Sequence, residues 1–353
     1  MGSLWEHLFH RRRATANRVR PGAVTAAAGL RHQPDTDTID TDAPRQIMPL
    51  AEIEDCFHRF VLSLPDATTE EPGNAELALL KRLRLLSVRF DTRNLPRLPS
   101  VLPQLLRTLR NDNAAGKQLS MLIGRDPLMV GEVMRVTSSV YYRSAQPVRS
   151  LQHAVILLGQ NGLRRVLTHH VMKPILQANA GTLSHLAGER LWDHAERCAH
   201  VCAVLGRNSG CDSFEAYLAG IICHSGTGAV IRMLGQLIPP DEMTFSSGFL
   251  AACAQLAAQL SMQAAQYWEL PQHVIEALTE RQHPDKTASL SPLGTALTGA
   301  DLLAIVQLLD EHRRLPEDLD LSPYWPDAYT PSLLHRCQLD LRRQFGAGRE
   351  HLT

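Results

Sequence analysis

Helix start signals recur along this chain, and they constrain its fold more than any other feature. Favoured N-cap residues stand before helix-like segments at Asp126, Asp212 and Ser291, and at the first and last of these Pro follows in the first helical position. Alternating β-branched runs bounded by turn residues are missing. Aromatic residues make up only 5% of the chain, so Leu, Ala, Val and Ile must fill most of the core. The sequence therefore predicts an all-α, multi-helix bundle with no significant sheet.

Apolar periodicity and turn residues place the expected helices. Gly159 is expected to end one helix, and Leu163 restarts the helical period after an Asn161-Gly162 turn. The segments expected to be helical are 48–64, 74–90, 128–137, 151–158, a stretch from 163, 191–206, 213–223, a stretch between Pro271 and Pro284, 292–309 and 333–345.

Charge and cysteine content exclude several classes of protein. Lys plus Arg and Asp plus Glu number 36 each, so net charge does not indicate a nucleic-acid partner. The seven cysteines form no Cys-x-x-Cys pair, which argues against a disulfide framework or a zinc ribbon and favours a reducing cytoplasm. No stretch approaches the roughly 20 apolar residues of a membrane span, and no secretion signal is evident.

The N-terminal region differs in composition from the rest. Residues 31–46 are polar and rich in Asp and Thr, which predicts a flexible segment over 1–47 followed by a helical extension over 48–92. Residues 1–13 place four apolar side chains on one helical face before three arginines. A weak membrane or partner contact and a frayed terminus are the two interpretations, and the shortness of the segment favours the second.

Two blocks of sequence resemble the HDOD family, a relative of the HD and HD-GYP phosphohydrolases. In the first block the resemblance rests on Leu98-Pro99, Asp126-Pro127, Ser138 to Tyr141, Pro147-Val148, Ser150-Leu151, Ala154-Val155 and Leu158-Gly159. Ser138 and Val140 depart from the Asn and Ala that are usual in the family. In the second block it rests on Leu191 to His194, Tyr217 to His224, Tyr267 to Pro271 and Gln282 to Pro284.

The resemblance covers roughly 200 residues, more than an ordinary small domain. It implies two packed helical halves, over 93–180 and 181–310. A helical tail over 311–353 is expected to follow them, because residues 333–345 are helix-like.

The resemblance also shows what is missing. An HD phosphohydrolase holds divalent metals with an adjacent His-Asp pair, further His residues and a distant Asp. Here the pair is His224-Ser225, and a neutral hydroxyl is a poor ligand for a divalent ion. The family's His-His position is Gln282-His283, and the helix over 251–265 has no His or acid. The resemblance thus implies a degenerate site without metal, cofactor or catalytic residue.

The surviving site positions are His194, His224, His283 and Asp301, and each has a plainer interpretation. His194 and His224 can be hydrogen-bonded core histidines, His283 can simply end a helix, and Asp301 can face solvent. Three His could in principle still bind zinc. Cys198 and Cys202 share a helical face with His194, which suits a soft metal site or, more often, apolar packing.

A small cationic cluster lies on the helix that follows Gly162. Arg164, Arg165, His169 and His170 are candidates for receiving a phosphate or a partner, although a solvated helix face is the ordinary explanation.

The leading hypothesis is a non-enzymatic bacterial protein of signal transduction, because the family is typical of such pathways and the His-Asp pair is lost. It would bind a protein partner or a small ligand, in a groove between the two halves. The alternative is a residual metal-dependent phosphohydrolase acting on a nucleotide or cyclic nucleotide through the surviving His residues. A nucleic-acid-binding regulator has weak support, since the arginines are spread along the chain.

Overall fold

The computed structural model describes residues 46–67, 69–88, 116–137, 148, 150–176, 181–238, 244–281 and 290–346. Within these ranges the chain is helical, with no sheet and one isolated bridge between Gln46 and Leu319. The helices are α2 (Leu50–Leu62), α3 (Asn74–Val88), α5 (Gly116–Ile123), α6 (Pro127–Thr137), α7 (Leu151–Leu176), α8 (Gly181–Asn208), α9 (Ser213–Ile222), α10 (Ser225–Leu237), α11 (Ser247–Tyr267), α12 (Gln272–Glu280), α13 (Pro292–Glu311) and α14 (Pro331–Phe345), with a short 3-10 turn η4 (Ser322–Tyr324). The predicted all-α class is confirmed.

The predicted N-caps form as expected. Asp126 Oδ1 accepts from Leu128 N at 2.9 Å, and Asp212 Oδ1 accepts from the backbone N–H groups of α9. Ser291 Oγ accepts from Gly294 N at 3.0 Å. Each bond satisfies an otherwise unpaired N–H of the first turn, so these side chains fix where α6, α9 and α13 begin.

The predicted break at Gly159 is also present. Gly159 has a φ of 63°, which divides α7 into two helical pieces across a kink. This left-handed conformation suits Gly because it has no Cβ to clash with the carbonyl.

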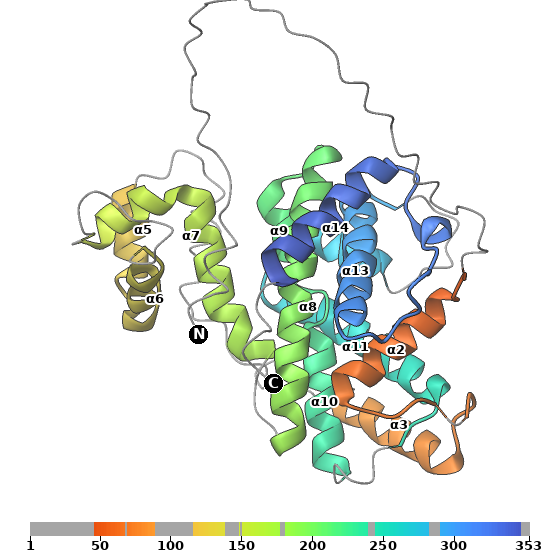
Figure 1. Ribbon diagram of the computed structural model, residues 1–353. Coiled ribbons are helices and arrows are strands. Elements are labelled where there is room, and N and C mark those ends of the chain that lie inside the picture. The colour runs from red at the N-terminus through yellow and green to blue at the C-terminus, as the bar shows by residue number, and fades with distance from the viewer. Residues whose placement is uncertain are drawn as a thin grey trace, which may run out of the picture.

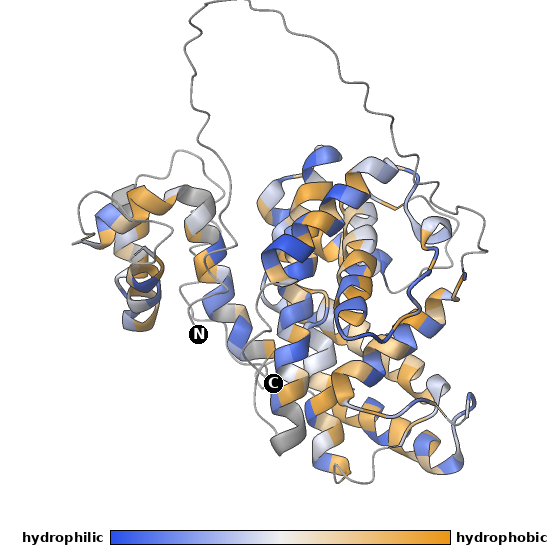
Figure 2. Cartoon of the chain, in the orientation of Figure 1, coloured by the Kyte–Doolittle hydropathy of each residue, from blue (hydrophilic) through white to orange (hydrophobic). Residues whose placement is uncertain are grey.

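Two apolar clusters form the core, and both pass through α8 and α13. One joins α5, α6 and α7 to α8, α9, α12, α13 and α14. The other joins α2, α3, α10 and α11 to α8 and α13. In Figure 1, α8 and α13 lie near the centre of the main body, whereas α5, α6 and the start of α7 stand apart from it. Figure 2 shows apolar and polar bands alternating along the helices, as expected for amphipathic packing.

The segment predicted as a helical extension is packed into the main body. Arg59 of α2 donates from Nη1 to Pro65 O at 2.9 Å and from Nη2 to Phe245 O at 3.0 Å. Arg190 of α8 donates to Phe60 O and to Ser63 Oγ. These bonds hold α2 across α8 and α11.

One sequence expectation needs correction. The windows Ser213–Leu237 and Pro292–Glu311 are long and apolar enough to cross a membrane by composition, although no stretch was expected to approach that length. In the structure 83% and 78% of these windows are buried within the protein. They correspond to α9 with α10 and to α13, whose apolar side chains belong to the two core clusters.

Candidate functional site

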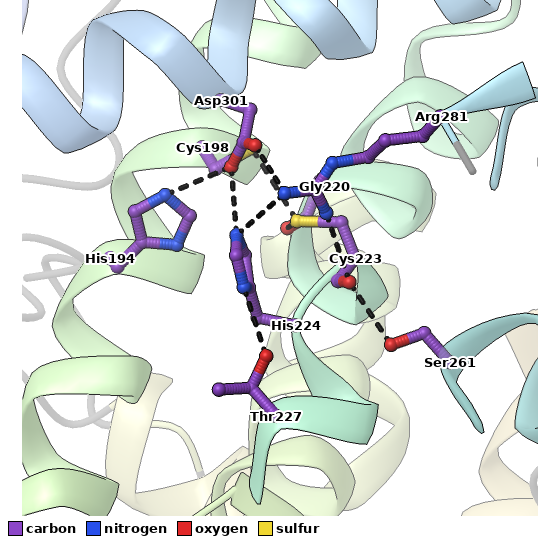
Figure 3. A network of polar contacts seen from close by, with 9 residues as sticks. All are labelled: His194, Cys198, Gly220, Cys223, His224, Thr227, Ser261, Arg281 and Asp301. Carbon is purple, nitrogen blue, oxygen red and sulfur yellow. Dashed lines mark hydrogen bonds and ion pairs between the residues drawn. The ribbon is translucent and has the colours of Figure 1, made fainter. Parts of the chain in front are cut away.

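Three predicted residues meet in one buried polar centre. His194 comes from α8, His224 from the turn before α10, and Asp301 from the middle of α13. Their nearest ligand atoms all lie within 4.8 Å of one another. Asp301 Oδ1 is 3.1 Å from His194 Nε2 and 3.0 Å from His224 Nε2 (Figure 3). Asp301 is buried, so the interpretation that it faces solvent is wrong.

The turn that carries His224 is fixed by its neighbours. Ser261 of α11 accepts a hydrogen bond from Gly226 N at 2.8 Å and donates one to Cys223 O at 3.1 Å. His224 Nδ1 lies 3.2 Å from Thr227 Oγ1. A side chain at position 226 would overlap the α11 backbone at Ala257 and Ser261. The glycine thus allows α10 to approach α11 closely and orients the His224 ring.

A fourth residue, which the sequence did not single out, completes the centre. Arg281, directly after α12, donates from Nη2 to Asp301 Oδ2 at 2.5 Å and from Nη1 to Cys223 O at 3.1 Å. Its Nη2 also lies 2.9 Å from His224 Nε2. Asp301 was a visible clue, because a buried carboxylate needs a cation, but the sequence does not show which arginine reaches it.

The charges of the centre support one another. Burial acts to raise the pKa of Asp301, but Arg281 and the two histidines hold that pKa well below its ordinary value. Burial and the nearby guanidinium lower the pKa of His224 to about 3. Burial alone would lower the pKa of Arg281, but the charge of Asp301 has the larger effect, so that pKa is raised. At neutral pH the centre therefore holds an anionic Asp301, a cationic Arg281 and a neutral His224.

Helix α2 covers the two imidazole rings. The Phe57 ring, which is fully buried, has its centroid 4.9 Å from that of His194 and 5.4 Å from that of His224. The charges of the centre also shift the pKa values of two further α2 side chains. Burial and Asp301 raise the pKa of Glu54, while burial and Arg281 lower the pKa of His58 to about 4. A segment outside the resemblance thus closes one side of the site.

The remaining predicted site positions are less informative. Ser225 is the first residue of α10, and its buried Oγ has no hydrogen-bond partner within the part of the chain that the structure describes. Gln282 and His283 lie outside the described residues, as does the N-terminal segment up to residue 45.

The cysteines and the cationic cluster that the sequence analysis named lie in different surroundings. Cys198 and Cys223 face each other with their Sγ atoms 3.9 Å apart, next to Asp301, and all seven cysteines are free thiols. In the cationic cluster, His169 is buried and lies 3.3 Å from Glu196 Oε1, whereas Arg165 lies over the Tyr217 ring. His170 is half-buried, and the Arg164 side chain is outside the described part. His169 therefore contacts α8, not an exposed ligand.

A divalent metal does not fit this donor set as it stands. The guanidinium of Arg281 already bonds Asp301 Oδ2 and lies at hydrogen-bond distance from His224 Nε2, the lone pair that would bind the ion. A second cation in the same contact would be repelled by the first.

The fold and the sequence both match known proteins. A solved structure of an HDOD domain protein of unknown function from Geobacter sulfurreducens aligns with a TM-score of 0.50 and 20% identity, over 76% of this chain and 89% of that one. A Shewanella amazonensis structure that is named for metal-dependent phosphohydrolase activity aligns with a TM-score of 0.49 and 18% identity, over 75% and 98% of the two chains. At 20% identity the likeness to the Geobacter sulfurreducens structure concerns the fold alone.

Sequence comparison gives the family. An uncharacterized protein of Treponema pallidum is 23% identical over 267 residues, which are 70% of this chain, and the chain spans about half the length of that relative. Residues 95–284 match the HDOD domain, and this match covers more than half of the chain. The chain belongs to the HDOD family.

Proposed function

We propose that this chain is a non-enzymatic regulatory protein of bacterial signal transduction, which works in the cytoplasm by binding a protein partner or a small ligand. The observation that carries the proposal is that other side chains cover the polar centre formed by His194, His224 and Asp301. Phe57 packs on both imidazoles from one side, and Arg281 bonds the carboxylate from another.

Metal-dependent phosphohydrolysis requires space beside the metal for a water and a phosphoryl group. In this centre the side chains of His194, His224 and Asp301 are only 0%, 6% and 11% exposed. The most exposed member is Arg281, at 24%. This low exposure of the donor set supports a role other than phosphohydrolysis.

Two further features support the proposal. Ser225 supplies a neutral hydroxyl where the enzymes have the carboxylate of the His-Asp pair. The seven free thiols, most of them buried, suit a reducing compartment.

Hydrolysis assays test whether the protein lacks phosphohydrolase activity. The purified full chain is incubated with nucleoside triphosphates and cyclic nucleotides in the presence of manganese, iron(II) or magnesium. We expect no phosphate release or ring opening above the protein-free rate, and no stoichiometric metal by elemental analysis. Metal-dependent turnover that His224→Ala and Asp301→Asn both abolish would overturn the proposal.

Partner capture tests the binding role. A tagged full chain, cross-linked in cells and purified beside a tag-only control, is expected to recover the same specific partner in repeated experiments. Repeated recovery of nothing specific, together with no small molecule in native mass spectra of the protein from cells, counts against it.

A residual phosphohydrolase is the second candidate, and one observation favours it. His194, His224 and Asp301 come together as a set that resembles part of a metal site. The hydrolysis assays decide between the two candidates, because the second requires activity that depends on all three residues.

A further inference from the structure

The polar centre contains a cation of its own. Arg281 reaches it from the end of α12 and contacts one residue of α13 and two of the turn before α10. Its guanidinium lies against the carboxylate and the imidazole nitrogen that face one another across the centre (Figure 3). A single positive charge is therefore held between the carboxylate and the imidazole that would otherwise be free to bind a metal ion.

His194 adds a possible metal ligand to the centre, beyond the groups that Arg281 bonds. Its side chain is fully buried, and Nδ1 has no hydrogen-bond partner among the described residues. Nε2 lies 3.1 Å from Asp301 Oδ1, the carboxylate oxygen that also faces His224 Nε2. Buried polar atoms are rarely left unpaired in this way, and an imidazole that faces a carboxylate places a nitrogen and an oxygen ligand side by side.

The ligand types around the centre suit zinc. Two imidazoles and a carboxylate already meet, and Cys198 and Cys223 bring two thiols within 4.8 Å of the same carboxylate. Nitrogen, sulfur and oxygen donors in this combination are typical of four-coordinate Zn²⁺ and of Co²⁺ as its substitute. Thr227 next to His224 Nδ1 is placed to orient that ring, as residues behind metal-binding histidines do.

We infer that Arg281 is the resident cation of this centre, and that replacing it by an uncharged residue turns His194, His224 and Asp301 into a zinc site. The arginine occupies the lone pairs that the ion would need and supplies the positive charge that Asp301 needs. The inference rests on the proposed function, because an active centre that held metal beside Arg281 would contradict both.

The test compares metal binding by full-length variants, with Zn²⁺ or Co²⁺ alone as the probe. Arg281→Met removes the charge at similar length, and Arg281→Gln keeps a donor for Asp301. Arg281→Lys keeps the cation, and Arg342→Met removes an exposed arginine paired with Asp310 elsewhere. We expect the Met and Gln variants to retain about one Zn²⁺ per chain after dialysis. Wild type, Arg281→Lys and Arg342→Met should retain none.

Two further readouts separate a defined site from loose binding. Co²⁺ should give the visible absorption of a four-coordinate ion in the Met variant. Excess Zn²⁺ should raise its melting temperature by about 5 °C while leaving wild type unchanged. Adding Asp301→Asn or His194→Ala to Arg281→Met should abolish both effects.

The possible results distinguish failure of this inference from failure of the proposed function. Folded Met and Gln variants that bind no metal overturn this inference and leave the proposed function intact. Stoichiometric metal in wild type, lost in Asp301→Asn, overturns both. If the two variants are insoluble, zinc supplied during expression should rescue them, and failure of that rescue also overturns the inference.

Discussion

At the scale of single residues, Asp301 depends on one partner more than on any other. Its carboxylate is buried, and Arg281 is the full positive charge in direct contact with it among the described side chains. Taking a carboxylate out of water costs several kcal/mol unless a cation and hydrogen bonds compensate. The stability of this centre therefore depends on Asp301 and Arg281 together.

Charge removal tests this dependence. In a buffer with chelator, Arg281→Met is expected to lower the free energy of unfolding by about 2–4 kcal/mol, because it leaves Asp301 buried without a cation. The estimate lies toward the lower end of measured values because the guanidinium is partly exposed. The double variant Arg281→Met with Asp301→Leu should recover most of the loss. Urea unfolding of the four proteins measures this, and additive losses would contradict it.

His200 of α8 gives a second prediction at this scale, away from the centre. Burial, with Arg165 and Arg207 nearby, lowers its pKa to about 4, and Phe345 of α14 packs edge-on against its ring at 6.3 Å. The unfolded chain, with a His pKa of about 6.5, binds this proton more readily. The stability that the neutral ring provides is therefore present above pH 6.5 and is lost as the pH falls toward 4.

The size of this effect follows from the shift. Between pH 7 and pH 5, wild type should lose about 2 kcal/mol more unfolding free energy than His200→Gln, which cannot titrate there. Urea unfolding at both pH values measures the difference. Equal losses in the two proteins would mean that His200 titrates normally in the folded state.

At the scale of elements, close helix contacts position the centre. A methyl group added at Gly220 of α9 would lie 2.6 Å from the Cα of Ala199 on α8, where only backbone could move away. This contact sets the distance between the helix that carries His194 and the one that leads into His224. A side chain at this position would separate the two histidines.

A pair of glycine substitutions measures that contact. Gly220→Ala is expected to cost about 1–3 kcal/mol, because overpacking forces the backbone apart. A methyl group at Gly131 of α6 meets no described atom within 4 Å, so Gly131→Ala should be neutral or stabilise by up to about 1 kcal/mol through helix propensity. Thermal and urea unfolding of both variants test this. Equal effects would show that helix spacing at Gly220 is not constrained.

At the scale of the whole molecule, the two ends of the HDOD region differ in how they are attached. Helices α5 and α6 pack mainly on α7, and they stand apart from the main body in Figure 1. Leu128 and Ile156 in this part are 72% and 68% exposed. By contrast, α8, α9 and α13 are surrounded by other helices. Regions with fewer buried contacts open at lower free energy.

Native-state hydrogen exchange tests this gradient. Amides of α6 and of residues 151–158 should exchange through local opening, at rates well above those of α8, α9 and α13. The slowest amides should report the unfolding of the whole main body. Peptide-resolved mass spectrometry distinguishes the two, and uniform protection over the chain would contradict the prediction.

The local features of this fold were readable from the sequence. Asp126, Asp212 and Ser291 cap helices where predicted, and Gly159 breaks α7 where predicted, because capping and glycine conformations depend on a few neighbouring residues. The family resemblance also identified His194, His224 and Asp301 as site positions. It did so through motif order, which the sequence carries directly.

What only the tertiary structure decided are contacts between distant segments. Arg281 bonds Asp301 across 20 residues, and Phe57 covers imidazoles that lie more than 130 residues away in the chain. Nothing local to Arg281 distinguishes it from the other arginines, and Phe57 belongs to a helix outside the family match. Sequence determined the helices and most of the polar centre, whereas the packing of α2, α12 and α13 around that centre decided which cation and which aromatic ring contact it.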